Sequence, residues 1–91
     1  MMELLYAMHG IELTPEQLAI VRVIDRTPDE PAVEMGELLA RLALTHPHPR
    51  AAEFAAAFRD VDRGDEKSSQ IRLSAVVDQW AAFVDRLARK S

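Results

Sequence analysis

The sequence of 91 residues contains no cysteine. A disulfide framework and a thiolate metal site are therefore both excluded as sources of stability. A chain this short must instead be stabilised by packing or by oligomerisation. No apolar run approaches the roughly 18 residues of a membrane-spanning helix, and the N-terminal stretch MMELLYAMHG lacks the basic region and cleavage site of a signal peptide. The sequence therefore predicts a cytoplasmic protein with no membrane partner.

Motifs for catalysis and for metal binding are also missing. Ser68, Ser69 and Ser74 have no glycine elbow around them, and no glycine-rich loop is present that could hold a phosphate. His46 and His48 stand two residues apart and could share a metal ion, but there is no HExxH motif and no third histidine at a useful spacing. We therefore expect no enzyme, no metal site and no cofactor, and we expect these histidines to lie in an exposed loop.

What the sequence does contain is an ordinary balance of apolar and charged residues, 48% and 29%. This balance and the length indicate one globular domain over residues 1–91. The formal net charge of -4 argues against a surface that coats phosphates, although a local basic face remains compatible with it.

The strongest local pattern predicts two consecutive helices that each begin at a proline. Thr14 is expected as the N-cap of the first, Pro15 as its first residue and Gln17 as the partner in a capping box. The following LAIVRVI segment is rich in β-branched residues, so a strand competes, but the start signals favour a buried helix. The second helix is expected to begin between Pro28 and Ala32.

Small residues recur every four positions in that second helix, at Ala32, Gly36 and Ala40. Glycine within a helix costs roughly 1 kcal/mol relative to alanine unless packing uses it. We therefore predict that another helix approaches closely at Gly36. Before this pair, Met1 to His9 is expected to form a short helix that ends at Gly10 in a left-handed conformation, with Ile11 folding back on it.

Two further helices are predicted after the prolines of His46-Pro47-His48-Pro49. One spans His48 to Asp60 and packs through Phe54 and Phe58. The last helix carries an apolar stripe that includes Val76, Trp80, Phe83 and Leu87. Between them, Gln70 to Ser74 alternates polar and apolar residues, so Asp62 to Ser74 is either a β-hairpin or the first turns of the last helix.

The order of these parts resembles the winged-helix regulators of the multiple-antibiotic-resistance (MarR) type. The resemblance covers Leu13 to Leu87 and rests on the segments LTPEQLAIVRVI, MGELLARLALT, DEKSSQIRLS and AVVDQWAAFVDRL. It implies a mainly α fold of four to five helices, with a helix-turn-helix core and a vestigial two-stranded wing around Arg63 to Ser74. It also implies a dimer that binds DNA and regulates transcription.

In a protein with this resemblance, the helix after His48 would enter the major groove and the wing would contact phosphates. The residues expected to contact nucleic acid or another partner are His46, His48, Arg50, Arg63, Lys67 and Arg72. However, the predicted recognition helix offers alanines where base-reading side chains are expected, and cations and acids balance between Pro49 and Ser74. The alternative is a helical protein-protein interaction module, such as an inhibitor, antitoxin or adaptor, that does not bind nucleic acid.

The last helix also predicts self-association, because its stripe exceeds what a small core covers. Trp80, Phe83 and Leu87 are the expected residues of a dimer or partner interface. The alternative is a monomer in which Trp80 packs into the core against Leu18, Val21 and Leu42.

Overall fold

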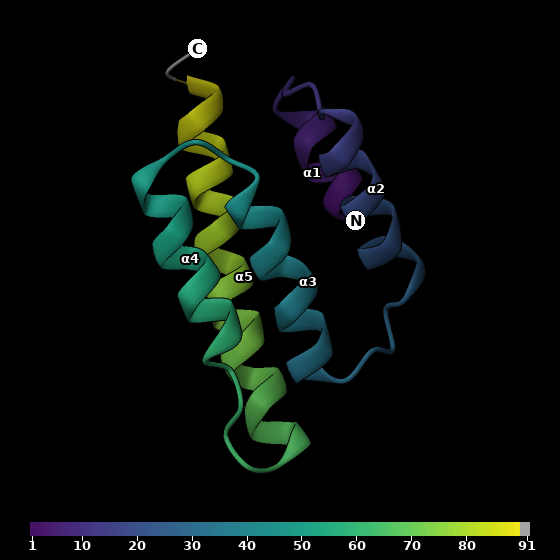
Figure 1. The fold of residues 1–91 in the computed structure, drawn as a ribbon, viewed down its shortest axis with the longest axis vertical. Helices are drawn as coiled ribbons and strands as arrows, with labels where there is room; N and C mark the ends of the chain where they lie inside the picture. The colour runs from purple at the N-terminus through teal and green to yellow at the C-terminus, as the bar shows by residue number, and fades with distance from the viewer. Residues whose placement is uncertain (90–91) are drawn as a thin grey trace.

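The computed structural model describes residues 1–89, and these form five α-helices and no strand. Figure 1 shows α3, α4 and α5 as a bundle, with α1 and α2 beside α3. The prediction of a mainly α fold of four to five helices is confirmed. The helices are α1 (Met2–Met8), α2 (Pro15–Arg26), α3 (Ala32–Leu44), α4 (Pro49–Arg59) and α5 (Glu66–Arg89).

Helix α1 ends in the predicted left-handed turn. Gly10 has a φ of 69°, which a residue with a Cβ adopts only with strain. The N–H of Gly10 donates to the carbonyl of Ala7, and the N–H of Ile11 donates to the carbonyl of Tyr6. These two bonds form a Schellman motif, which satisfies carbonyls at the end of the helix and returns the chain towards α2.

Helix α2 begins with the predicted capping box. The Thr14 side chain accepts from the N–H of Gln17 at 3.2 Å, and the Gln17 side chain accepts from the N–H of Thr14 at 2.9 Å. The LAIVRVI segment lies within this helix, so the competing strand is wrong. The amide of Gln17 also donates to the Thr45 hydroxyl at 3.1 Å, which connects the start of α2 to the end of α3.

Helices α3 and α4 form an antiparallel hairpin around the small residues of α3. Gly36, near the start of α3, lies against Phe58, near the end of α4, and a Cβ at Gly36 would overlap the carbonyl oxygen of Phe58. Ala32 and Ala40 are completely buried. The predicted close helix contact is therefore confirmed. The two helices lie side by side (Figure 1), whereas a DNA-binding helix-turn-helix crosses at a wide angle.

The segment from Asp62 to Ser74 contains no hairpin, and the expected two-stranded wing is wrong for these residues. Only Asp60–Asp65 separates α4 from α5, and Gln70 to Ser74 is helical. The helix is favoured because it places Leu73 in the core at 6% exposure. Ile71, which fits the strand pattern, is left in solvent at 65% exposure. The Asp65 carboxylate accepts from the N–H of Ser68 at 2.7 Å and so caps the new helix.

The core is closed by aromatic side chains around Trp80. The Trp80 ring lies 5.3 Å from that of Phe54 and 6.1 Å from that of Phe58, measured between centroids. Val21, Leu39 and Leu42 are buried beneath this seam. The prediction that α4 packs through Phe54 and Phe58 agrees with this arrangement, because both rings are buried.

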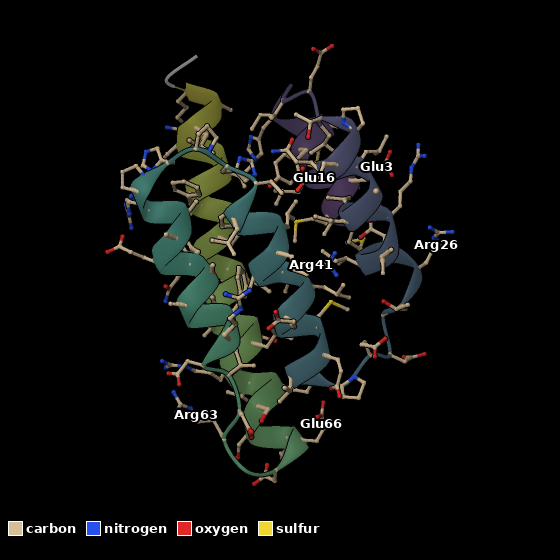
Figure 2. All side chains as sticks on the ribbon, viewed as in Figure 1. Glu3, Glu16, Arg26, Arg41, Arg63 and Glu66 are labelled. Atoms are coloured by element: carbon tan, nitrogen blue, oxygen red, sulfur yellow. The ribbon has the colours of Figure 1, made fainter. Side chains whose placement is uncertain are left out.

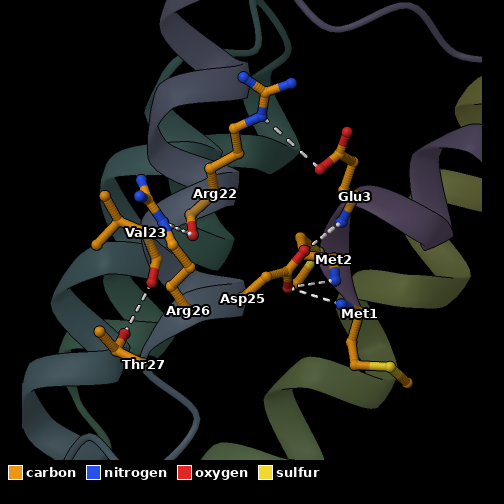
Figure 3. A network of polar contacts seen from close by, with 8 residues as sticks. All are labelled: Met1, Met2, Glu3, Arg22, Val23, Asp25, Arg26 and Thr27. Carbon is orange, nitrogen blue, oxygen red and sulfur yellow. Dashed lines mark hydrogen bonds and ion pairs between the residues drawn. The ribbon is translucent and has the colours of Figure 1, made fainter.

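Helix α1 is joined to the molecule by a carboxylate from α2. Asp25 accepts from the backbone N–H groups of Met2 at 2.8 Å and Glu3 at 3.0 Å, as Figure 3 shows. It also lies 2.8 Å from the amino group of Met1. Helix α1 has no cap of its own, so Asp25 supplies from another helix the acceptor that its first turn needs.

Candidate functional site

The six residues predicted to contact nucleic acid or a partner do not converge on one surface. Arg50 lies in the first turn of α4, whereas Arg63 follows its last turn, at the opposite end of the bundle (Figures 1 and 2). Lys67 and Arg72 are exposed on the first turns of α5. Arg63 is in addition 3.5 Å from the Asp60 carboxylate, which neutralises its charge locally.

The two histidines of this set lie against the core. His48 is the N-cap of α4: its Nδ1 accepts from the N–H of Arg50 at 3.1 Å, and its ring lies edge-on to Phe83. The Nε2 of His46 shares a hydrogen bond of 2.8 Å with the Tyr6 hydroxyl. Both histidines lie in the connection between α3 and α4, as expected, but they are half-buried and not exposed, because their rings pack against Tyr6, Trp80 and Phe83.

Tyr6, His46 and Trp80 form a polar cluster inside the molecule. The rings of Tyr6 and His46 are stacked 5.8 Å apart, and the ring of Trp80 meets His46 edge-on. Burial lowers the pKa of His46. Burial also raises the pKa of the Tyr6 hydroxyl far above its ordinary range. The indole Nε1 of Trp80 has no hydrogen-bond partner among the described residues. Neutral side chains thus meet here, and we assign this cluster to the core.

The residues predicted for a dimer interface lie mostly inside one chain. Trp80 is 0% exposed and Phe83 is 4% exposed, while Leu87 is partly buried against the core. Both aromatic rings are therefore used within the domain, and for Trp80 this is what the monomer alternative expected. Nothing in the structure tests self-association itself, which stays a prediction.

An apolar groove opens between α2 and α5, and the sequence did not identify it. Met35 and Leu39 of α3 lie between Ile24 of α2 and Val77 of α5. The volume of the groove is about 210 Å³. The full lining is Met1, Met2, Ile24, Asp25, Pro28, Met35, Leu39, Leu73 and Val77. Asp25 is the one charged side chain among these, and it is already bonded to the start of α1.

The groove continues into an exposed apolar stripe on α1. Met1, Leu4 and Met8 are spaced so that they share one side of this helix, and they are 87%, 54% and 72% exposed. All four methionines of the sequence, Met1, Met2, Met8 and Met35, thus belong to the groove or to this stripe. The signal that could have revealed this surface is that concentration of methionine, because methionine side chains adapt to irregular apolar partners.

The described residues contain no group of three or more histidine, cysteine, aspartate or glutamate side chains that could hold a metal ion. Among residues 1–89, no helix combines the length and the apolar character needed to cross a membrane. Comparison with protein-family models, with curated proteins and with solved structures finds no match to this chain.

Proposed function

We propose that this protein is a non-enzymatic, helical protein-interaction module that binds an amphipathic helix of a partner protein in the groove between α2 and α5. The observation that carries the proposal is the groove itself, which is apolar, open to solvent and lined by three methionines. Surfaces of this composition accept apolar helix faces, whose side chains enter the groove at helical spacing.

The form of the groove favours a helix as the occupant. Its walls are the helices α2 and α5 and its floor is α3, so a bound helix would pack against them as the helices of a bundle pack against each other. The nearby α2–α3 connection adds the acidic side chains Asp29 and Glu30, neither of which forms an ion pair with a cation in residues 1–89. A partner helix with an apolar face and basic flanks would suit this charge.

The regulator of transcription expected from the resemblance is less well supported by the geometry. A DNA-binding surface needs several cations along one face, and those of this chain are dispersed or paired. In α4, the helix expected to read bases, Ala51 and Ala55 are buried, and Arg59 is 3.2 Å from Glu37. We therefore rank a protein partner above DNA, with DNA binding kept as an outcome of the test.

The proposal is tested by photo-crosslinking in the source cells. A photoreactive residue at Val77, on the wall of the groove, is expected to capture one partner at a helical segment with an apolar face. The matched control places the same residue at Ile71, which is exposed on α5 but does not line the groove. Capture from both positions alike, or from neither, would contradict the proposal.

A second measurement separates the other hypotheses. Light scattering on the purified chain reports self-association, and the homodimer predicted through the last helix would double the mass. Gel shifts at low salt with fragments of the source genome report DNA binding. With the photoreactive residue kept at Val77, loss of partner capture in Met35→Glu, another residue of the groove, would support the groove as the binding site. If Met35→Glu left a change in mass or a gel shift of DNA unaltered, that activity would belong to another surface.

A further inference from the structure

A second hollow lies on the other side of α5, where this helix meets α4. Its volume is about 250 Å³, and its lining is Arg50, Phe54, Gln79, Ala82, Phe83 and Arg86. Two smaller hollows adjoin it and share several of these residues: one extends towards His48 and the other towards Glu53 and Ala57. Together they form a strip along the α4–α5 seam, which we call the arginine strip.

Two arginines without ionic partners flank this strip. The guanidinium groups of Arg50 and Arg86 form no hydrogen bond or ion pair with the described residues. In contrast, Arg59, Arg63 and Arg89 each have a carboxylate within 4 Å. Glu53 is the one carboxylate that lines the strip, against two cations. The strip therefore presents unneutralised positive charge on a chain whose net charge is negative.

The floor between these arginines is aromatic. Phe54 and Phe83 lie 5.2 Å apart between ring centroids, and the His48 ring borders Phe83 at the same distance. Both phenylalanines belong to the core, so the floor is held in place by the packing around Trp80. A ligand on this floor would bury apolar surface while its anionic groups reached the guanidinium groups, whose planar donors bind carboxylates in pairs.

The shape of the strip indicates a peptide. Sites for small molecules are concave and enclose most of the ligand, usually in about 300 to 1,000 Å³. The arginine strip is instead divided into three adjoining hollows of about 250, 130 and 80 Å³, which share lining residues of α4 and α5. A segment of polypeptide can follow such a row, with apolar side chains on the floor and acidic side chains beside the arginines.

We infer that the arginine strip is a second binding site, which takes an acidic peptide segment that carries apolar side chains. The site does not depend on the groove between α2 and α5, because no residue lines both. The two sites can therefore be occupied independently. A partner helix can bind the groove while the strip is empty, and an acidic peptide can bind the strip while the groove is empty.

The test is a titration of the isotopically labelled full chain with short synthetic peptides, followed by amide chemical shifts. The probe is acetyl-Glu-Glu-Phe-Leu-Glu-Glu-amide. We expect weak, saturable binding with a Kd on the order of 1 mM, and shifts concentrated in Arg50–Phe54 and Gln79–Arg86. The affinity should fall as salt is raised from about 0.05 M to about 0.5 M, because exposed charges are screened.

Three control peptides isolate the chemistry. Replacing the glutamates by glutamine removes the charge, replacing them by lysine reverses it, and replacing Phe-Leu by Ser-Ser removes the apolar part. Each change should abolish saturable shifts at the strip. If the lysine peptide bound as well as the acidic one, or if the Ser-Ser peptide did, recognition by both charge and apolar contact would be disproved.

Variants locate the site on the protein. Arg50→Gln and Arg86→Gln should each weaken binding about tenfold, the usual effect of losing one charge-assisted contact. Arg41→Gln removes the same charge from an exposed position of α3 and should leave the affinity unchanged. Equal losses in all three variants would show attraction to overall charge, and no loss in the first two would place the peptide elsewhere. Unchanged amide spectra outside the strip verify that each variant is folded.

Discussion

At the scale of single residues, the most restrictive position is Gly36. Its lack of a side chain lets α3 approach the backbone of α4 at Phe58, and Val61 also lies beside the missing Cβ. The neighbouring backbone belongs to a helix, so it cannot move aside without disturbing the hairpin. Packing at this point involves main chain more than side chains, and the alanines at positions 32 and 40 extend it along α3.

We predict that Gly36→Ala destabilises the protein by about 1 to 3 kcal/mol, the usual cost of forcing extra atoms into a packed interior. This outcome opposes the gain in helix propensity that alanine normally brings. The measurement is urea unfolding of the variant and of the wild type. Val33→Ala, at an exposed position of the same helix, is the control and should change stability little. A more stable Gly36→Ala protein would show that the hairpin is looser than described.

The burial of the His46 ring predicts that the stability of the protein depends on pH. Burial lowers its pKa in the folded state, so the folded protein binds a proton at this ring less readily than the unfolded chain does. The free energy of unfolding is therefore highest above the pKa of about 6.5 that His46 has in the unfolded chain. It decreases as the pH falls from there through the lower pKa of His46 in the folded state. The measurement is the free energy of unfolding between about pH 7.5 and pH 5. His46→Gln should flatten the curve in that window, and an equally steep curve for the variant would assign the effect to other groups.

At the scale of elements, α1 depends on α2 for its start. A helix of seven residues has little stability of its own, because its nucleus is costly and its ends are unsatisfied. The carboxylate of Asp25 bonds to two of the first N–H groups of α1. The contact between His9 and Asp85, at 3.5 Å, connects the other end of α1 to α5.

We predict that Asp25→Ala loosens α1 and costs about 1 kcal/mol, the usual value of an N-cap. The effect should appear as faster amide exchange in α1. Burial would raise the pKa of Asp25, but the Met1 amino group and the N–H groups of Glu3 and Met2 outweigh it, so the pKa is lowered. The stabilisation by Asp25 is thus fully present above the pKa that this carboxyl group has in the unfolded chain. It is lost as the pH falls through the lower pKa of Asp25 in the folded state. Asp29→Ala, in an exposed loop, is the control.

The elements also show how far the sequence alone could lead. Helix start and end signals that depend on neighbouring residues are predictable because their bonds are local: Thr14 with Gln17 begins α2, and Gly10 with Ile11 ends α1. The segment Gln70 to Ser74 was ambiguous because alternation over so few residues fits a strand and also the edge of a helix. The helix is favoured over the strand by a contact that is distant in sequence, because it buries Leu73 in the core.

The candidate surfaces were harder to predict than the helices. The groove brings together residues of four helices, and no local pattern reports which apolar residues a neighbouring helix leaves uncovered. Arg50 was identified as a contact residue, but Arg86 was not, because only the packing of α4 on α5 places them at one hollow. The burial of His46 is not predictable from the sequence, because the sequence cannot show that Tyr6, forty residues away, supplies its partner.

At the scale of the whole molecule, Trp80 touches most of the fold. Its ring meets His46 of the α3–α4 connection, Phe54 and Phe58 of α4, and Phe83 of its own helix. The stack of Tyr6 on His46 extends this cluster to α1. The single tryptophan is therefore surrounded by rings of α4, α5 and the α3–α4 connection, and Tyr6 of α1 lies one ring further away.

We predict that tryptophan fluorescence and far-ultraviolet circular dichroism report one coincident unfolding transition in urea. A small domain with one core unfolds cooperatively, and α1 is connected to that core through Tyr6 and Asp25. The fluorescence should shift to longer wavelength as the buried indole meets water. Loss of helix signal at lower urea than the fluorescence change would show that α1 and α2 separate first. Disruption of the Tyr6 contact by Tyr6→Leu is expected to bring about that separation.

The exposed connection Asp60–Asp65 has a consequence for the integrity of the chain. Five of its six residues are exposed, and Val61 alone is buried. Loop tips of this kind are where proteases cleave folded proteins. A single nick there would divide the protein into a four-helix piece and α5, which would then form a complex of two polypeptides held by the rings around Trp80. Dilution would dissociate that pair, and mixing the two pieces would restore the tryptophan environment.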